Sequence, residues 1–320
     1  MNHKILAAHL LIAALLISCS PVSSSNSNSP EIQAPTKIVE SPPAAEEKQL
    51  EAVLAVNTED ATRGMIYLVD SITGERRQFL ELPDLYSDHY HPVEYKAGSL
   101  FVIHRFDYEG LGDSDWRSEL WVYDQNGNGR KITGAFNLDF RASPDGMTVA
   151  VSENDSLAFL DQNGNEFSRL TIGQIAALLP GSQDAMIDFE GWSQDSSKFW
   201  GKLTVASQVL GFFETNNLGG DMRVYDLAGI PFSSLEYSLN FSTGKLVFSD
   251  HPVFFDADSA ERFKTSGQPV TLYLLDLPTK TLTVIANGTA MPFDPVWLGE
   301  GQIEYNDPAN PGGRLEFMVE

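Results

Sequence analysis

The sequence predicts an all-β fold that is built by repeating one small antiparallel sheet. The first observation is a stretch of alternating apolar residues that ends in Asp and recurs along the chain. The copies occupy residues 66–70, 120–124, 157–161, 222–226 and 272–276. The second observation is that turn residues such as Gly, Asn and Thr follow these copies and lead into another strand, as in a β-hairpin. A sheet that repeats about every 40 to 55 residues is typical of a β-propeller, in which the sheets pack radially as blades.

A second element recurs between these copies and sets the number of sheets. It is clearest at residues 143–146, where the sequence Ser-Pro-Asp-Gly precedes an apolar strand. Weaker versions stand at residues 95–98, 192–195, 241–244 and 297–301. The aligned positions 95, 142, 192, 241 and 297 are 47, 50, 49 and 56 residues apart. Six blades of four antiparallel strands therefore fit residues 50–320, with seven blades as the alternative.

The repeat is incomplete at both ends. Residues 50–56 fit the second strand of a blade, and the chain ends directly after a strand at residues 314–319. Neither end then completes a four-stranded sheet. We expect strands from the two ends to share one blade or to lie side by side, because either arrangement would close the ring of blades.

The Ser-Pro-Asp-Gly element, followed by an apolar strand that ends in Asp, resembles the repeats of TolB-like propellers, which are relatives of the WD-type propellers. The resemblance covers about residues 50–320, and the copy at residues 143–146 carries it most clearly. It implies a propeller domain. TolB proteins also have a small α/β domain before the propeller, whereas this chain has a Ser- and Pro-rich segment in that place.

Residues 1–18 have the features of an export signal peptide. Lys4 supplies positive charge, and residues 5–17 are apolar apart from His9. This run is too short to span a bilayer as a helix. Residues 16–19, Leu-Ile-Ser-Cys, resemble the bacterial lipobox, which implies that Cys19 is lipidated and becomes the first residue of a mature lipoprotein. The alternative is an ordinary secretory signal with an incidental cysteine. Because Cys19 is the only cysteine, the chain forms no intramolecular disulfide.

Residues 19–49 are expected to be the lipidated cysteine and a disordered tether. Residues 20–49 contain seven Ser and five Pro and almost no large apolar side chains, so they bury too little surface to fold. A flexible coil of this length reaches roughly 30 Å. Ser20 follows the cysteine, where Asp would retain a lipoprotein at the inner membrane. The resemblance therefore implies anchoring in a lipid bilayer at the outer membrane of a two-membrane organism, and otherwise at the outer face of the cytoplasmic membrane.

The charge of the chain restricts its partners. Without residues 1–18, the chain has 20 Lys and Arg against 44 Asp and Glu, a formal net charge of −24. Coulombic repulsion disfavours a nucleic acid or an anionic membrane as the partner of this surface. Cations and basic partners fit better. The alternative is that the acidity serves solubility alone.

The connections between the expected strands are of two kinds. The Ser-Pro-Asp-Gly turns and the turns after each Asp are short, and the repeat places them at one end of the strands. The long connections, at the other end, are residues 104–119, 204–221, 249–271 and 306–313. Long irregular loops on one face are a typical position for a binding site. The candidate residues of this partner face are Asp107, Asp113, Asp115, Trp116, Asp250, Phe254 and Phe255.

Histidines on the same face raise the question of a metal. His91, His104 and His251, with nearby carboxylates, form a candidate site for a divalent cation, since imidazole and carboxylate are ligands of several such ions. The alternative is that these histidines cap strands or lie in solvated loops.

Two further motifs are interpreted as turns of the fold. Residues 124–129 resemble the first half of an EF-hand loop, but the twelfth position is Ala135 and not Glu. Residues 193–200 resemble a sialidase Asp-box, which stabilises the fold in sialidases as well.

These observations predict a monomeric, lipid-anchored binding or scaffold protein whose long-loop face engages an envelope protein, a peptide or a glycan. No catalytic residue and no cofactor are expected, because the sequence lacks a Gly-x-Ser-x-Gly elbow and a phosphate-binding glycine loop. The alternative is a metal-dependent hydrolase or lyase that acts at the mouth of the propeller channel, with His91, His104 and His251 as candidate ligands.

Overall fold

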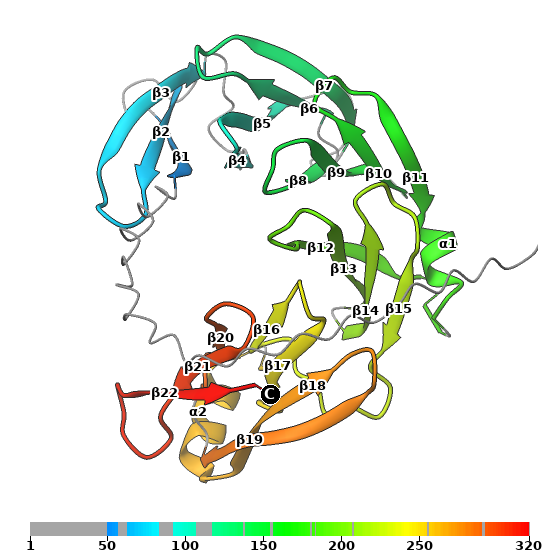
Figure 1. The fold of residues 1–320 in the computed structure, drawn as a ribbon. Helices are drawn as coiled ribbons and strands as arrows, with labels where there is room; N and C mark the ends of the chain where they lie inside the picture. Colours follow the sequence, from blue (N-terminus) through cyan, green and yellow to red (C-terminus); the bar gives the residue numbers. More distant parts are fainter. Residues whose placement is uncertain are drawn as a thin grey trace, which may run out of the picture. The chain divides into compact units, whose positions relative to one another are not determined.

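A computed structural model shows that the described chain is nearly all-β, which confirms the all-β part of the predicted fold class (Figure 1). The strands form six antiparallel sheets, which we number 1 to 6 along the chain. The structure describes residues 50–56, 63–82, 92–106, 117–136, 138–153, 156–179, 181–182, 184–206, 208–254, 256–289 and 292–319. The predicted signal peptide, Cys19 and the tether lie outside these residues.

The first three sheets lie in the N-terminal half of the described chain. Sheet 1 has three strands: β1 (Leu50–Val56), β2 (Gly64–Asp70) and β3 (Arg76–Leu82). Sheet 2 has four: β4 (Val93–Lys96), β5 (Ser99–Phe106), β6 (Arg117–Tyr123) and β7 (Gly129–Phe136). Sheet 3 also has four: β8 (Asp139–Ala142), β9 (Thr148–Glu153), β10 (Ser156–Asp161) and β11 (Glu166–Thr171).

The remaining three sheets follow the same meander. Sheet 4 has four strands: β12 (Met186–Trp192), β13 (Lys198–Val205), β14 (Gln208–Asn216) and β15 (Arg223–Asp226). Sheet 5 has four: β16 (Tyr237–Asn240), β17 (Lys245–Ser249), β18 (Pro269–Asp276) and β19 (Thr281–Thr289). Sheet 6 has three: β20 (Val296–Trp297), β21 (Gln302–Asn306) and β22 (Arg314–Met318).

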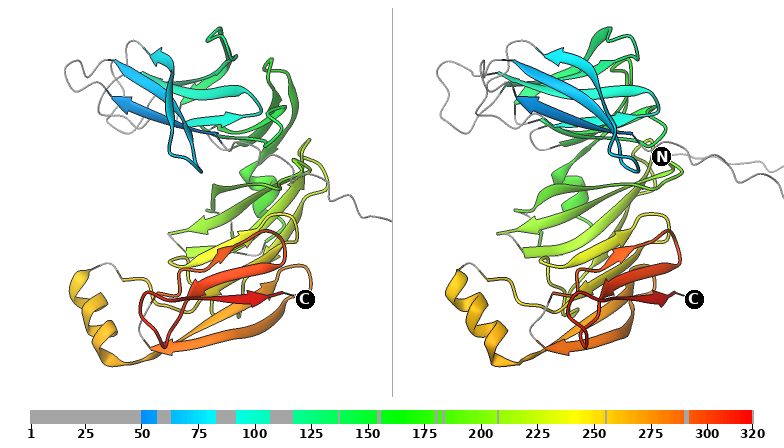
Figure 2. Two further views of the ribbon diagram at one scale, coloured as in Figure 1. Left: turned by 60° about the vertical axis from the view of Figure 1, so that its left-hand side comes forward. Right: turned by 90° about the vertical axis from the view of Figure 1, so that its left-hand side faces the viewer.

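Sheets that follow one another in sequence are neighbours in space. Their first strands contact each other: β1 contacts β4, β4 contacts β8, β8 contacts β12, and β16 contacts β20. Side chains reinforce these contacts, because Glu94 on β4 accepts a hydrogen bond of 2.8 Å from the backbone N–H of Ala142 on β8. The two views in Figure 2 show the same succession of sheets.

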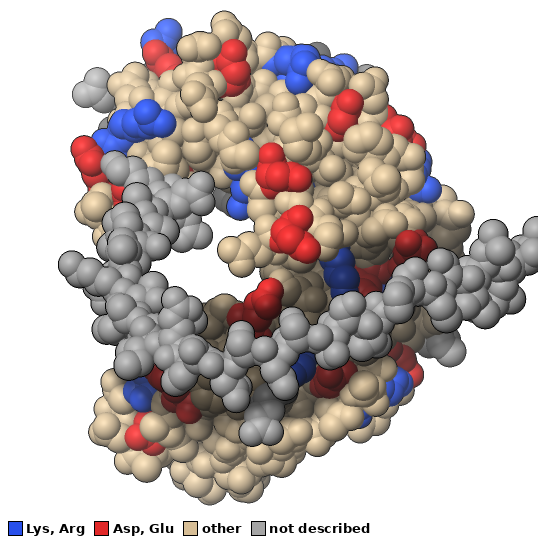
Figure 3. All heavy atoms as spheres, in the orientation of Figure 1, with Lys and Arg blue, Asp and Glu red and all other residues tan. Residues whose placement is uncertain are grey.

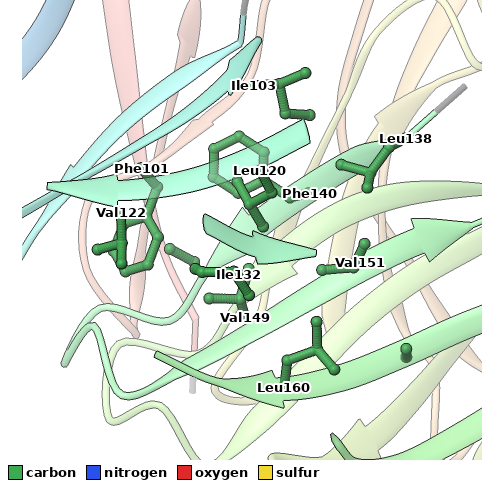
Figure 4. Packing of buried hydrophobic residues seen from close by; sticks show 12 residues of the cluster. Phe101, Ile103, Leu120, Val122, Ile132, Leu138, Phe140, Val149, Val151 and Leu160 are labelled. Carbon is green, nitrogen blue, oxygen red and sulfur yellow. The ribbon is translucent and has the colours of Figure 1, made fainter. Parts of the chain in front are cut away.

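The hydrophobic core lies between neighbouring sheets. In the cluster of Figure 4, apolar side chains of sheet 2 meet those of sheet 3. Phe101, Leu120, Phe140 and Val149 are all fully buried there. Alternate residues of a strand point to the same side, so each strand supplies a row of such side chains. Burying one of them contributes roughly 1.5–3 kcal/mol, which makes the interfaces between sheets the main source of stability.

The two ends of the described chain lie in different sheets. β1 belongs to sheet 1 and β22 to sheet 6. The prediction that strands from both ends share one blade is therefore wrong for the residues that the structure describes. β1 is a strand with the expected bounds, and it pairs with β2, which contains the first copy of the Asp-terminated repeat. The first and last sheets consequently have three strands each, where the repeat has four.

Sheet 4 departs from the expected pattern. Residues 204–221 were expected to be a long loop, but most of them form the end of β13 and the strand β14. Residues 222–226, expected as a third strand, therefore contribute the fourth strand, β15. The reason is burial on both faces: Phe212 packs in the cluster shared with sheet 5 and Phe213 in the cluster shared with sheet 3, and both are fully buried.

Two helices interrupt the strands. α1 (Ile172–Ala176) follows β11, and α2 (Ala257–Ser266) lies in the connection between β17 and β18. Asp256 caps the N-terminus of α2 by accepting a hydrogen bond from the Ser259 N–H, and Gly267 ends the helix in the left-handed conformation at φ 65°. Among the residues described, no helix is long and apolar enough to cross a membrane.

Candidate binding groove

The short turns at one end of the strands use their carboxylates to hold the backbone. Oδ1 of Asp124 accepts hydrogen bonds from the N–H groups of Asn126 and Asn128, at 2.8 and 2.9 Å. Asp161 accepts the equivalent pair in sheet 3. The Asn128 side-chain amide also donates to Asp124, and this bond, followed by the backbone bonds, lowers the pKa of Asp124. The EF-hand-like segment is thus the turn between β6 and β7, as the sequence predicts.

The Ser-Pro-Asp-Gly turn and the Asp-box-like turn have the same geometry. Ser143 donates its hydroxyl to Asp145 at 2.5 Å, and Ser193 donates to Asp195 at 2.6 Å. The hydrogen bonds from Ser193 and then Ser197 lower the pKa of Asp195 to about 2. Both motifs are therefore turns that connect the first and second strands of a sheet.

The long connections lie at the opposite end of the strands. In an antiparallel sheet, successive connections alternate between the two ends, so those after the second and fourth strands share one end. Among the described residues, 206, 227–236, 250–254, 256, 292–295 and 307–313 belong to this set. The end that holds them is the one on which the sequence placed the partner face.

A pocket of about 610 Å³ lies at this end, between connections of sheets 5 and 6 and helix α2. We call it the Glu236 pocket. Its lining residues are Leu235, Glu236, His251, Phe254, Ala260, Phe263, Lys264, Pro292, Asp294 and Asn306. The residues come from three connections, one of which contains α2, and from the end of β21, so that positions 70 residues apart in the chain meet.

Three aromatic rings form one wall of the Glu236 pocket. The ring of His251 lies 5.9 Å from that of Phe254 and 5.2 Å from that of Phe263, in both cases edge to face. Phe254 and Phe263 are themselves 5.2 Å apart. Because α2 is capped at both ends, it holds Phe263 against the other two rings. All three rings are half-buried, so one side of the wall is available to a ligand.

Glu236 supplies a buried carboxylate to the same pocket. It is 8 % exposed. Its Oε2 accepts hydrogen bonds from the Ser249 hydroxyl at 2.6 Å and from the Phe293 N–H at 3.2 Å. Its Oε1 is buried and has no hydrogen-bond partner among the described residues. A buried acceptor without a donor costs free energy, so Glu236 has an unused capacity to accept a hydrogen bond.

A second pocket of about 520 Å³ adjoins the first, and His251 lines both. Its other lining residues are Ala206, Gln208, Val209, Leu227, Ile230, Pro231, Phe232, Ser233, Ser234, Asp250, Pro252 and Val253. Leu235 and Val253 are 53 % and 44 % exposed at the edges of the two pockets. Because His251 lines both, we treat the two pockets at the ends of sheets 4, 5 and 6 as one candidate site, which we call the His251 groove.

The described candidates of the partner face have different roles. Phe254 lines the Glu236 pocket, as just described. Asp250 lines the second pocket, but Oδ1 of its carboxylate accepts a hydrogen bond from the backbone N–H of Thr271 at 2.7 Å, which fixes the start of β18. The remaining candidates, Asp107, Asp113, Asp115, Trp116 and Phe255, lie outside the described residues.

The two described histidines of the candidate metal site have separate surroundings. Nε2 of His104 on β5 lies 3.0 Å from the Tyr123 hydroxyl, and its ring packs against Trp121. His251 instead contacts the aromatic wall of the groove. No group of three His, Cys, Asp or Glu side chains that could hold a metal is found in the described parts of the chain, and His91 lies outside them.

A polar cluster of Glu190 on β12, Lys202 on β13 and Tyr237 on β16 joins sheets 4 and 5. Lys202 lies 2.8 Å from Glu190 and 2.8 Å from the Tyr237 hydroxyl, which in turn donates to Glu190 at 2.8 Å. Burial, followed by the charge of Glu190, raises the pKa of Tyr237 to about 12. Burial alone would lower the pKa of Lys202, but Glu190 and Tyr237 outweigh it and raise the pKa. Both groups stay protonated at neutral pH, so the cluster is a structural link between sheets.

Ion pairs at the surface bring acidic side chains close to basic ones. Arg169 lies 2.8 Å from Glu153 and 2.7 Å from Glu166. Figure 3 shows Asp and Glu beside Lys and Arg at several points of the visible face. Such exposed pairs contribute little stability.

Sequence reasoning missed Glu236, Phe263, Asp294 and Asn306 as lining residues. The capping residues Asp256 and Gly267 could have indicated α2 and therefore the position of Phe263. Nothing in the sequence near Glu236 distinguishes it from other acidic residues, because its neighbours in the pocket are distant in the chain.

No protein-family model matches the chain, and no curated protein does. Solved structures with a similar arrangement include TolB from Acinetobacter baumannii, with 14 % identity over 80 % of this chain and 57 % of that protein, at a TM-score of 0.44. This chain thus spans little more than half of the TolB protein.

Two other similar structures have further functions in their names. An oligogalacturonate lyase in complex with manganese has 14 % identity over 82 % of this chain and 87 % of that protein, at a TM-score of 0.43. The β-propeller domain of the Trilobed protease from Pyrococcus furiosus has 12 % identity over 79 % of this chain and 72 % of that one, also at 0.43.

Proposed function

We propose that this protein is a lipid-anchored binding protein of the bacterial cell envelope that engages an extended ligand in the His251 groove. In this proposal, residues 50–320 form a six-bladed TolB-like propeller, and Cys19 attaches it to a bilayer through the tether of residues 20–49. The export signal, the lipobox-like residues and the lone cysteine support the anchor.

The observation that carries the binding role is that two pockets at this end of the strands share the lining residue His251. Each has a volume of several hundred cubic ångströms, 610 and 520 Å³, which is the size of typical ligand sites. A ligand that fills both must be longer than a single small molecule, so a peptide or a segment of a partner protein fits the groove. The aromatic wall supplies apolar surface, and Glu236 supplies a polar contact.

The groove differs from the opposite end of the strands in what its polar groups do. There, the carboxylates of Asp124, Asp161 and Asp195 are occupied by backbone groups of their own turns. In the groove, Oε1 of Glu236 has no such partner among the described residues. The groove therefore retains unused binding capacity, whereas the turns described serve the fold.

The experiment is capture of envelope components by the full-length, detergent-solubilised protein, compared between matched variants. Phe263→Ala removes part of the aromatic wall. Phe167→Ala removes an exposed phenylalanine of β11, which is 47 % exposed and lines neither pocket. We expect the Phe263→Ala protein to capture much less of the partner than the wild type does, and the Phe167→Ala protein to capture as much. Equal capture by the two variants would place binding elsewhere on the protein.

A further inference from the structure

The unused oxygen of Glu236 determines what kind of group the pocket lacks. A carboxylate oxygen accepts hydrogen bonds and, when ionised, donates none. Oε1 of Glu236 is buried without a donor among the residues that the structure describes, while Oε2 is already occupied by Ser249 and Phe293. The missing group is therefore a hydrogen-bond donor. A cationic donor would form the stronger, charge-assisted bond.

The wall beside Glu236 determines the shape of the group that carries this donor. The rings of His251, Phe254 and Phe263 meet edge to face or at a tilt, the last pair at 47°. No two of the three rings are coplanar, so they do not combine into one flat platform for a sugar ring. An unbranched aliphatic chain can lie along these rings while its polar end reaches a buried acceptor, as lysine side chains do elsewhere in proteins.

The charges around the pocket favour the same ligand. Glu236 and Asp294 both line it with one ammonium group, that of Lys264, and Asp294 also lies 3.4 Å from the Arg314 guanidinium, so Glu236 is the lining carboxylate left for a cationic ligand. Lys264 lies in the last turn of α2 and is exposed, so its charge is screened by water. The whole chain is acidic, with a formal net charge of −23, which attracts basic ligands over a longer range.

We infer that the Glu236 pocket takes a basic side chain of an extended peptide, with its aliphatic part along Phe254 and Phe263 and its ammonium group at Oε1 of Glu236. This inference rests on the proposed binding function of the His251 groove and specifies the chemistry at one end of it. The rest of the peptide would lie across His251 in the second pocket, beside Val253.

The test uses small probes that share one chain and differ in the end group. n-Pentylammonium, pentan-1-ol and pentanoate are titrated separately into the full-length, detergent-solubilised protein and followed by ligand-observed NMR. We expect pentylammonium to bind about ten-fold or more tightly than pentanol, the ratio typical of a charge-assisted hydrogen bond, and pentanoate to bind most weakly. Equal binding of the ammonium and the alcohol, or tightest binding of pentanoate, would overturn the inference.

Matched variants locate the effect. Glu236→Gln should reduce the ratio of the pentylammonium affinity to the pentanol affinity at least several-fold. Glu261→Gln makes the same charge change on α2 outside the pocket lining and should leave this ratio unchanged. Because Glu236 also bonds Ser249 and Phe293, thermal unfolding is used to verify that the variant is folded. Phe263→Ala gives a second check, since it should weaken the binding of pentylammonium and the binding of pentanol to the same extent. A preference that survives Glu236→Gln contradicts the inference.

The outcomes separate this inference from the proposed function. Capture of envelope components can depend on Phe263 while pentylammonium binds no more tightly than pentanol. In that case the groove binds a ligand of another kind, such as a glycan, and only the basic-side-chain inference fails. If Phe263→Ala changes neither capture nor probe binding, the proposed function fails as well.

Discussion

The indole N–H of Trp192 donates a hydrogen bond of 3.0 Å to the backbone carbonyl of Arg141, 51 residues earlier in the chain. The bond joins β12 of sheet 4 to β8 of sheet 3. The same relationship recurs between Trp297 on β20 and the carbonyl of Ser238 on β16, also at 3.0 Å. A tryptophan at the end of a short first strand thus connects one sheet to the preceding one at two places in the chain.

Replacing Trp192 is expected to destabilise the junction of sheets 3 and 4. Trp192 is 7 % exposed, and its ring also packs edge to face on Phe159 and Phe199. Trp192→Phe keeps an aromatic ring but removes the donor, and we expect a loss of about 1–3 kcal/mol in the free energy of unfolding, measured by urea denaturation. Trp297→Phe, at a half-buried position, should cost less. Equal losses would show that the hydrogen bond, and not burial, decides the effect.

The cluster of Tyr237, Lys202 and Glu190 predicts a dependence of stability on alkaline pH. The pKa of Tyr237 is raised from 10.0 to about 12 in the folded protein. A raised folded-state pKa means that the stabilising contribution is complete below pH 10 and is lost as the pH rises toward 12. The free energy of unfolding should therefore fall more steeply over this range in the wild type than in Tyr237→Phe. Parallel curves for the two proteins would contradict the assignment. Tyr225, whose pKa is also raised to about 12, contributes to the slope that remains in the variant.

Asp195 predicts the corresponding effect at acidic pH. Its pKa is lowered from 3.8 to about 2, chiefly by the Ser193 hydroxyl. Because the folded-state pKa is lowered, its contribution is present above pH 3.8 and is lost as the pH falls through 2. An NMR titration of the carboxyl carbon should give a midpoint near 2 in the wild type, and Ser193→Ala should move it toward 3.8. An unchanged midpoint would show that other donors hold the carboxylate.

The predicted anchor at Cys19 is tested by changing that residue alone. Cys19→Ser removes the thiol that would carry the lipid. We expect the wild type to incorporate labelled palmitate and to sediment with membranes, and the variant to incorporate none. Ser18→Ala, beside the cysteine, serves as the control and should behave as the wild type does. Labelling of the Cys19→Ser protein would rule out lipidation at this site.

The sequence indicated the sheets correctly because the features that form them are local. Alternating apolar residues ending in Asp124, Asp161 and Asp276 lie on the third strands of their sheets, and each Asp accepts hydrogen bonds from its own turn. The bounds of β1 and the turns at residues 143–146 and 193–196 were likewise predictable. The position of β14 was not, because burial of Phe212 and Phe213 depends on two neighbouring sheets.

By itself, the sequence determined the all-β repeat, the short turns at one end of the strands, and the long connection between β17 and β18 at the other. The tertiary structure decided which side chains meet there. Glu236, Phe263 and Asn306 are far apart in the chain and line one pocket only because the meander returns every second connection to the same end of its sheet. The carboxylate of Asp195 is occupied by its own turn, whereas Glu236 keeps one oxygen without a donor among the described residues. This difference depends on that packing and not on the neighbouring residues in the sequence.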